Sequence, residues 1–579
     1  MKKFLEDVKE DKIIHYILIA LAAIIAGIPL INLRIYGTDD GFIHILRIIG
    51  VDNILKIGEF PPLIYSKYIR GFGYAINLFY PPIVTYVPLF FRIFNIDYIN
   101  CLKIYSFITI LISGITMYQL VKEITAKRPI ALFAAIVYIF IPYRLETIYN
   151  RFAIGEFSAY MFLPLLFLGL YNLFKKDGMK HYYIAISAIG LILCHQITTE
   201  YAAIFSLIYV LLNIKQLKNK EIVKKLMINI IFILGITAFF TIPIIEHKIA
   251  TDYGILSPKI MLSEGKNVAN TTIDFKLLFT GVDENTNIEF SLGITLIILI
   301  IIGIFTYKKT DENYKQEYLL FVLIAIISLF MTTKFFPWGI MPSVLSTLQF
   351  AWRMLAFFEF AISIIVAINL YTFINIVSKD KNYLNNILTS ITIIILMLTM
   401  SKINYNYKYD QQKAVDDKTY EENIINSKTI SHASINREYL PCKALKLQKN
   451  YLINREDRIY ILQGNAEVKE ENKDGLNLNA QIKNIDKDTV LELPYIYYLG
   501  YKVSIEYNNQ TKELKNFESD NGFVAVKISE DISDAKITVK YTGTIIEKNS
   551  YVISIIFLMG FIIYIIYFKN REENTKGEK

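Results

Sequence analysis

Residues 13–33 read IIHYILIALAAIIAGIPLINL and contain no Asp, Glu, Lys or Arg. A helix needs about 20 predominantly apolar residues to cross a bilayer, so this run predicts a membrane-spanning helix. No clear small-residue cleavage site accompanies the run, and we expect the helix to be retained. The stretch therefore indicates a membrane protein, and the rest of the chain supports that assignment.

Similar apolar runs recur along the chain. Hydrophobic residues make up 54% of the 579 residues and charged residues 20%, whereas soluble domains average about 45–50% and about 25%. This composition excludes a disordered chain, and three scattered cysteines without a CxxC pair favour neither a disulfide framework nor a structural zinc site. Windows of about 19 residues predict roughly twelve spans. They lie near residues 13–33, 101–121, 129–143, 157–174, 182–195, 200–213, 226–245, 290–306, 317–333, 351–372, 387–400 and 550–568.

The distribution of lysine and arginine predicts the orientation of these spans. Every second predicted connection is basic, and short basic loops face the cytoplasm. Both termini, residues 1–12 and 569–579, are therefore expected in the cytoplasm. The net charge of +8 then reflects orientation, and no nucleic-acid partner is expected. Basic connections include Lys122, Lys127 and Arg128; Lys175, Lys176 and Lys180; and Lys215, Lys218, Lys220, Lys224 and Lys225.

A long first outer loop, residues 34–100, follows the first span. Its segment 41–56 mixes apolar and charged residues, and we expect a helix lying in the membrane interface. Residues 80–94 are apolar but contain three prolines and Arg92, and counting them as a span would reverse the basic loops. They are therefore assigned to the outer loop.

A second polar region, residues 401–549, also falls on the outer side. Alternating runs such as Val524, Val526 and Ile528 predict half-buried strands. We therefore expect an α-helical polytopic membrane protein. Its transmembrane domain is residues 13–400, its extracytoplasmic β-rich domain is residues 401–549, and its last helix is residues 550–568.

Ionisable residues at membrane depth are costly, and they often mark functional sites. In this chain they gather at the outer boundary, where residues 38–47 read TDDGFIHILR. If this segment starts a helix, Asp40, His44 and Arg47 share one face. A carboxylate there can accept a proton from a hydroxyl while cations attract a phosphate. The alternative is that Asp39 caps the helix and Asp40 joins a surface ion-pair network, and spacing alone does not separate the two.

Further candidates lie at the ends of later spans. Arg151 and Glu156 are placed to bind or orient a phosphate, or to form an outer-loop salt bridge. Arg353, four residues after Gln349, is placed to bind phosphate or to snorkel to the interface. Asp39 and Asp40 are also candidate ligands for a divalent cation, although two adjacent carboxylates are an unspecific signal. No other cofactor is expected.

These residues belong to a set of recognisable motifs, namely residues 38–47, 58–61 (GEFP), 71–74 (GFGY), 79–82 (FYPP), 149–156 (YNRFAIGE), 348–353 (LQFAWR) and 438–441 (EYLP). The set resembles a family of bacterial multispan membrane proteins whose shared region is named 6-pyruvoyl-tetrahydropterin synthase-related. Nothing in the chain suggests pterin chemistry. One departure is Ala351, where the family would have proline, and it weakens the assignment of Arg353.

That family resembles the GT-C superfamily of glycosyltransferases. The resemblance implies a polyprenyl-phosphate sugar donor, a membrane lipid environment, and an acidic residue of the first outer loop as base or acceptor ligand, a role that falls to Asp40 or Asp39. From their position and charge we expect His44, Arg47, Arg151, Glu156, Gln349 and Arg353 to bind the donor phosphate or the substrate.

We therefore expect a glycosyltransferase that acts on a cell-envelope glycan at the outer face of the cytoplasmic membrane. Twelve spans would also suit a transporter or flippase of lipid-linked glycans, although no internal repeat is visible. A non-catalytic envelope assembly protein is a third hypothesis. Assays for transfer and for translocation separate the three.

Overall fold

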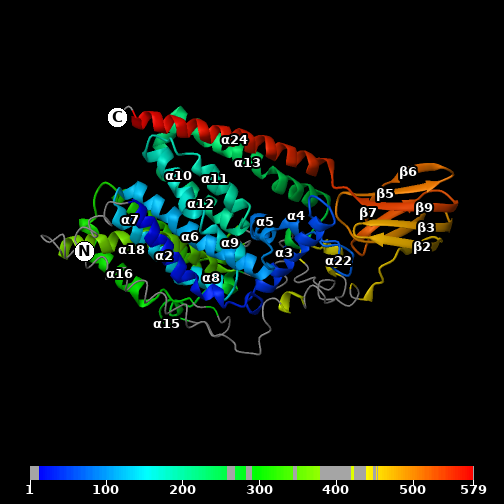
Figure 1. The fold of residues 1–579 in the computed structure, drawn as a ribbon, viewed down its shortest axis with the longest axis horizontal. Helices are drawn as coiled ribbons and strands as arrows, with labels where there is room; N and C mark the ends of the chain where they lie inside the picture. Colours follow the sequence, from blue (N-terminus) through cyan, green and yellow to red (C-terminus); the bar gives the residue numbers. More distant parts are fainter. Residues whose placement is uncertain are drawn as a thin grey trace.

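The computed structural model describes residues 12–256, 268–281, 288, 290–342, 348–377, 419–422, 438–446, 452 and 454–577. It consists of a large helical part and a β-sheet part that lies at one end of it (Figure 1). This arrangement confirms the predicted fold class, a mostly helical chain with candidate membrane spans and a β-rich C-terminal domain. The predicted domain boundaries and the membrane orientation stay predictions.

Seven of the described helices, some of them with a short helix that continues them, are long and apolar enough to cross a membrane. An eighth span is obtained if the bent pair α7 and α8 is counted as one. The seven are α2 (Lys12–Gly27) with η1 (Ile28–Ile31), α6 (Tyr98–Thr125), α9 (Ile154–Ala159) with α10 (Leu163–Lys175), α13 (Lys220–Ala250), α17 (Lys315–Thr332), η10 (Ala351–Met354) with α18 (Leu355–Val377), and α24 (Ile545–Gly577).

The other predicted spans in the described residues are also helical but shorter. They are α11 (Tyr183–Ile192), α12 (Gln196–Leu212) and α16 (Ile294–Thr306). The predicted span at residues 387–400 lies outside the described residues. The remaining short elements are η4 (Ile214–Lys218), η5 (Gly254–Leu256), η6 (Val268–Thr271), α15 (Leu277–Thr280), η7 (Tyr307–Lys309), η8 (Trp338–Ile340) and α22 (Cys442–Lys446).

Helix α7 (Arg128–Phe140) forms the centre of the helical part. All its residues from Ile130 to Phe140 are buried, as expected for a helix that is apolar on every side. It packs against α2, α6 and α18. It packs closely on α6 at Gly114, where an added Cβ atom would lie only 2.6 Å from Ile139 Cδ1. A small residue at this position allows the close packing of the two helices.

The helix is interrupted between α7 and α8 (Pro142–Tyr149), and the two segments are bent by 40° relative to each other. A break leaves carbonyl groups free on one side and N–H groups free on the other. The buried Arg144 donates to the carbonyl oxygens of Tyr138 and Ile139 at 3.3 and 3.1 Å. The buried Glu359 of α18 accepts from the backbone N–H groups of Tyr143 and Arg144 at 2.6 and 3.0 Å. These two charged side chains therefore stabilise the break.

The first outer loop folds into short helices. They are η2 (Ile35–Gly37), α3 (Gly41–Lys56), α4 (Ile76–Phe79), α5 (Ile83–Phe90) and η3 (Phe91–Phe94). Helix α3 has the predicted bounds, but ten of its residues are buried, so protein covers much of the surface that we expected to face the membrane interface. Tyr65 and Tyr68 donate from the following loop to the carbonyl oxygens of Arg47 and Leu46.

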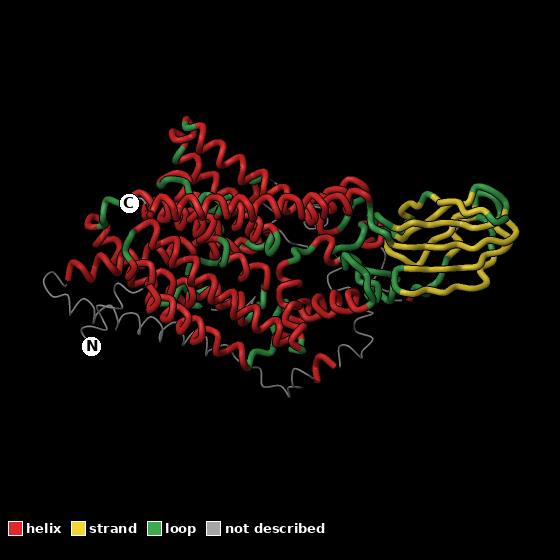
Figure 2. Tube along the Cα trace, turned by 45° about the horizontal axis from the view of Figure 1, so that its top comes forward, coloured by secondary structure: helices red, strands yellow, loops and turns green. Residues whose placement is uncertain are grey.

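The β-sheet part is a pair of antiparallel sheets (Figure 2). Alternate residues such as Leu478, Ala480 and Ile482 are buried, which agrees with the predicted half-buried strands. One sheet has the order β1 (Tyr460–Gln463), β4 (Thr489–Ile496), β8 (Phe523–Ile528), β7 (Asn516–Glu518). The other has the order β2 (Glu467–Asp474), β3 (Asn477–Ile485), β9 (Ile532–Tyr541), β5 (Tyr501–Tyr507), β6 (Gln510–Leu514).

Hydrogen bonds, ring contacts and the last helix join this sheet part to the helical part. The N–H of Ile496 donates to the carbonyl oxygen of Phe72 at 2.9 Å, and the ring of Phe72 packs edge-on against Phe523. After β9, helix α24 runs back beside α13 (Figure 1). Ser554 of α24 accepts from the N–H of Phe239 and donates to the carbonyl oxygen of Gly235.

Candidate functional site

The two aspartates lie in the short loop between η2 and α3. Asp40 is the N-cap residue of α3, yet its side chain makes no capping hydrogen bond. The hydroxyl of Thr38 accepts from the N–H of Gly41 at 3.2 Å instead. The alternative in which Asp39 caps this helix is therefore wrong, since Thr38 occupies that role. The side chain of Asp39 is exposed and that of Asp40 is partly exposed.

Backbone hydrogen bonds hold this loop against the turn after α8. The N–H of Asp39 donates to the carbonyl oxygen of Asn150 at 3.2 Å, and the N–H of Asp40 donates to that of Arg151 at 2.9 Å. Two predicted motifs that are more than a hundred residues apart in the chain are therefore hydrogen-bonded to each other through their backbones. Arg151 reaches this position because it follows the end of α8, the second half of the bent pair α7–α8.

A buried network of charge lies under the aspartates. Arg151 Nη1 lies 3.1 Å from both Glu156 Oε2 and the Tyr143 hydroxyl. Tyr143 donates to Glu156 Oε1 at 2.6 Å. Arg353 Nε lies 3.4 Å from Glu156 Oε2. Glu156 thus lies within ion-pair distance of two arginines. The predicted alternative, a salt bridge between Arg151 and Glu156, is therefore observed, and Arg353 also takes part in it.

Gln349 supports Arg353 from the preceding turn. Its backbone has a φ of +64°, a conformation that is uncommon for a residue with a side chain. Gln349 Oε1 accepts from Arg353 Nη1 at 2.8 Å, and the carbonyl oxygen of Leu348 accepts from the same nitrogen at 3.0 Å. Arg353 is therefore held within the protein, and it does not extend freely as a snorkelling side chain would.

His44 and Arg47 are buried one turn further along α3. Arg47 Nη1 lies 3.4 Å from His44 Nδ1, its guanidinium carbon lies 3.5 Å above the Tyr80 ring, and Nη2 donates to the Tyr439 hydroxyl at 3.2 Å. Burial lowers the pKa of His44 well below its usual value, and Arg47 lowers it further. His44 is therefore neutral near pH 7 and adds no positive charge.

Burial also affects the two aspartates. It raises the pKa of Asp39 and of Asp40, and the positive charge of Arg151 opposes the rise in both. Arg353 and Arg47 are further positive neighbours of Asp40. A carboxylate with a raised pKa accepts a proton more readily than an ordinary aspartate. The predicted face of Asp40, His44 and Arg47 is thus extended by arginines from two other parts of the chain.

Two residues near this network were not among the sequence candidates. Tyr143 bonds both Arg151 and Glu156, but a tyrosine in an apolar run carries no signal in the sequence. His195, an electrostatic neighbour of Glu156, Arg353 and Arg151, accepts at Nδ1 from the N–H of Thr198. Its proton in the neutral form therefore lies on Nε2. For His195 the sequence does carry a signal, because it is an ionisable residue at the end of the predicted span 182–195.

The described residues contain no group of three or more His, Cys, Asp and Glu side chains that could hold a metal ion. Asp39 and Asp40 have Arg151 as their strongest charged neighbour, an environment that disfavours a second cation. The divalent cation stays a prediction.

Comparisons with known proteins give limited similarity. No family model matches the chain. An uncharacterised protein of Lactococcus lactis subsp. cremoris is 26% identical over 352 residues, which cover 58% of this chain. The chain spans 56% of the length of that relative. An oligosaccharyltransferase structure from Archaeoglobus fulgidus, tethered with an acceptor peptide, aligns with a TM-score of 0.41 and 13% identity over 71% of this chain and 59% of its own.

Proposed function

We propose that the protein is a membrane glycosyltransferase of GT-C type that uses a polyprenyl-phosphate sugar. The observation that carries the proposal is the pairing of two accessible aspartates with the buried Arg151–Glu156–Arg353 network. Buried cations that face an accessible carboxylate suit a reaction in which a hydroxyl loses a proton and a phosphate leaves.

In the proposed reaction Asp40 acts as the general base. It accepts the proton of an acceptor hydroxyl as that oxygen bonds to the anomeric carbon of the donor sugar, and the bond from that carbon to the phosphate oxygen breaks. The raised pKa of Asp40 favours this proton transfer. Asp39 binds the acceptor, and the two aspartates remain interchangeable in these roles.

The departing phosphate gains negative charge, which Arg151 and Arg353 stabilise. A guanidinium suits phosphate because its donors form a planar fork. Arg353 Nε lies 3.4 Å from Glu156 Oε2 but forms no hydrogen bond among the described residues, and neither does the buried Trp352 Nε1 of the neighbouring residue. Glu156, which lies within ion-pair distance of both arginines, keeps the two side chains in place before the donor binds.

We further propose that the site and the β-rich domain face outward, with both termini in the cytoplasm, and that the acceptor is a glycan of the cell envelope. The basic connections between the predicted spans support this orientation. In Figure 1 the C-terminus lies at the end of the helical part remote from the strands, which supports placing the tail and the β-rich domain on opposite sides.

The test is transfer of labelled sugar from a polyprenyl-phosphate donor by purified full-length protein in vesicles. We expect Asp40→Asn to lower kcat by about 10²–10⁴-fold, the usual contribution of a general base, and Asp39→Asn to raise the KM of the acceptor. Asp520→Asn, at an exposed position of the β-rich domain, is the control.

Full activity in Asp39→Asn, in Asp40→Asn and in the double variant would remove the aspartates from catalysis. Movement of the lipid carrier across the vesicle membrane without any glycosylated product would instead support a flippase.

A further inference from the structure

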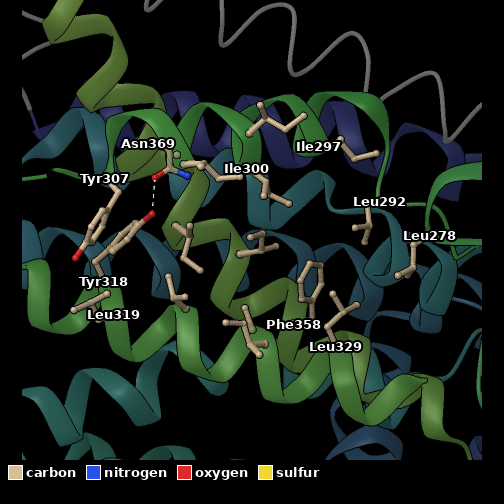
Figure 3. Close-up of a pocket in the computed structure, with 18 of the residues that line it drawn as sticks. Leu278, Leu292, Ile297, Ile300, Tyr307, Tyr318, Leu319, Leu329, Phe358 and Asn369 are labelled. Atoms are coloured by element: carbon tan, nitrogen blue, oxygen red, sulfur yellow. Dashed lines mark hydrogen bonds between the residues drawn. The ribbon is translucent and has the colours of Figure 1, made fainter. Parts of the chain in front are cut away.

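An apolar pocket of about 460 Å³ lies between α16, α17 and α18 (Figure 3). Its size is typical of a small-molecule site. Exposed side chains such as Ile301, Ile304 and Ile326 form part of its lining, so the pocket opens sideways, away from the helical core. In a bilayer this opening would face the hydrocarbon chains.

The pocket is elongated along two antiparallel helices. On α17 its lining extends from Tyr318 to Leu329, and on α18 from Phe358 to Asn369. Each stretch contains 12 residues, and its ends lie about 16 Å apart along the helix. Tyr318 donates to Asn369 Oδ1 at 2.9 Å and closes one end with polar atoms, as Figure 3 shows.

The other end lies near the charged network. Phe358 of α18 lines the pocket, and Arg353 precedes it by five residues in η10. Leu292 also lines the pocket, and Phe290 packs against Trp352 with ring centroids 5.8 Å apart. Trp352 is the direct neighbour of Arg353. The apolar pocket and Arg353 are therefore close in sequence, on α18 and on the short helix η10 that precedes it.

We propose that this pocket holds the hydrocarbon chain of the lipid-phosphate donor. The inference rests on the proposed function, because it assigns the chain of the same substrate whose phosphate lies at Arg353. An amphiphile with an anionic head and a long chain matches both features at once. The chain of a neutral phospholipid matches the pocket but brings no additional anion to Arg353.

The physical role of the pocket is positioning. Lipid chains are as apolar as leucine, so the hydrophobic effect does not drive a chain from the bilayer into the pocket. Shape and van der Waals contact hold the chain, and the chain in turn aligns the phosphate with Arg353. We therefore expect the pocket to affect the KM of the donor more than kcat.

Two neighbouring residues of α17 provide matched variants. Val322 lines the pocket, whereas Leu323 is exposed and is not part of the lining. Val322→Trp fills the pocket, and Leu323→Trp adds the same ring outside it. With a long-chain prenyl-phosphate sugar, we expect the KM to rise roughly fivefold to tenfold in Val322→Trp, which corresponds to about 1–1.4 kcal/mol of lost donor binding. Leu323→Trp should leave the KM unchanged, and a short-chain donor should not distinguish the variants.

Equal KM values for both variants with the long-chain donor would overturn the inference while transfer itself still supported the proposed function. If no donor gives transfer, crosslinking replaces the kinetic measurement. Full-length protein in vesicles is irradiated with a diazirine at the chain end of prenyl phosphate or of phosphatidylcholine. Preferential labelling of α16–α18 by prenyl phosphate, lost in Val322→Trp, supports the inference. Equal labelling by both lipids, or crosslinks to a second copy of the chain at this face, overturns it.

Discussion

Individual charged residues at the candidate site fall into two groups with different physical roles. Arg151 and Glu156 are almost fully buried and bond each other, and burial of such ions is tolerated only with good partners. Asp39 and Asp40 are held through their backbone atoms, and the Asp39 side chain is exposed while that of Asp40 is partly exposed. The buried pair therefore fixes geometry, and the accessible pair is available for chemistry.

This division predicts a stability cost at Asp40. Burial raises the pKa of Asp40 in the folded state, so the folded state binds that proton more tightly than the unfolded state does. Ionisation therefore lowers the free energy of unfolding. This cost is absent below the unfolded pKa, grows as the pH rises through the folded pKa, and is complete above it.

We expect Asp40→Asn to raise the apparent unfolding temperature at neutral pH and the difference to disappear at acid pH. Thermal unfolding of the solubilised protein followed over a pH series measures this. Asp520→Asn, at an exposed side chain, should show no such pH-dependent gain. A lower unfolding temperature of Asp40→Asn at neutral pH would contradict the assignment of burial as the dominant effect.

Tyr143 provides a second prediction at the residue scale. Tyr143→Phe removes the hydroxyl that bonds Glu156 and Arg151, and a lost hydrogen bond to a charged group costs about 1.5–3 kcal/mol. We expect roughly a tenfold rise in donor KM, because both arginines lose support. Tyr118→Phe removes a hydroxyl that bonds His15 at 3.0 Å and should leave the KM unchanged. Equal KM values for the two variants would exclude a role of Tyr143 in holding the network.

Among the elements, the break between α7 and α8 is decisive for the site. A continuous helix would carry Arg151 along the axis of α7, whereas the 40° bend turns α8 toward the loop of Asp39 and Asp40. The same break explains why two ionisable residues, Arg144 and Glu359, are buried between the helices. Arg144 satisfies carbonyl groups at the end of α7, and Glu359 satisfies N–H groups at the start of α8.

We therefore expect Glu359→Gln to destabilise the bent connection between α7 and α8. The amide keeps one acceptor oxygen, but its NH₂ group replaces the oxygen that the second backbone N–H requires. The expected loss is about 1–3 kcal/mol of stability together with lower transfer activity. Glu317→Gln is the matched control, since Glu317 is buried at the other end of the helical part and lies 3.9 Å from Lys175. The unfolding temperature and the transfer rate measure both effects, and full activity in Glu359→Gln would remove the break from the construction of the site.

At the scale of the whole molecule, α24 connects the last strand back along α13. The contact is close, because a Cβ at Gly235 would lie 2.2 Å from the ring of Phe557. At Gly560 of α24 the nearest atom to such a Cβ is Phe232 Cε1 at 3.8 Å. The two glycines therefore give a matched pair in one helix–helix contact.

Gly235→Ala should separate the helices and cost about 1–3 kcal/mol, the usual effect of overpacking. Gly560→Ala should be neutral or stabilising by about 0.5–1 kcal/mol, because alanine favours the helix. Unfolding temperatures of the two variants in the same detergent test this. If Gly235→Ala were as stable as the parent protein, α24 would not be anchored to α13 in the observed way.

Most of the fold follows from local pattern. Residues 13–33 and the other apolar runs determine helices because a bilayer admits little else, and alternating residues such as Leu478 and Ala480 determine strands. Helix α3 could be predicted with its bounds. Its burial could not, because the tyrosines that cover it come from a loop without regular pattern.

The sequence alone also determined which charged residues are candidates for a functional site, since ionisable groups at membrane depth are costly. It could not decide how they are paired. The backbone partner of Asp40 is Arg151, more than a hundred residues away, and Glu156 lies within ion-pair distance of two arginines from different elements. Only the tertiary structure decided these pairs, because they depend on how α8, α18 and the first outer loop pack, and that packing is set by contacts between distant segments and not by local periodicity.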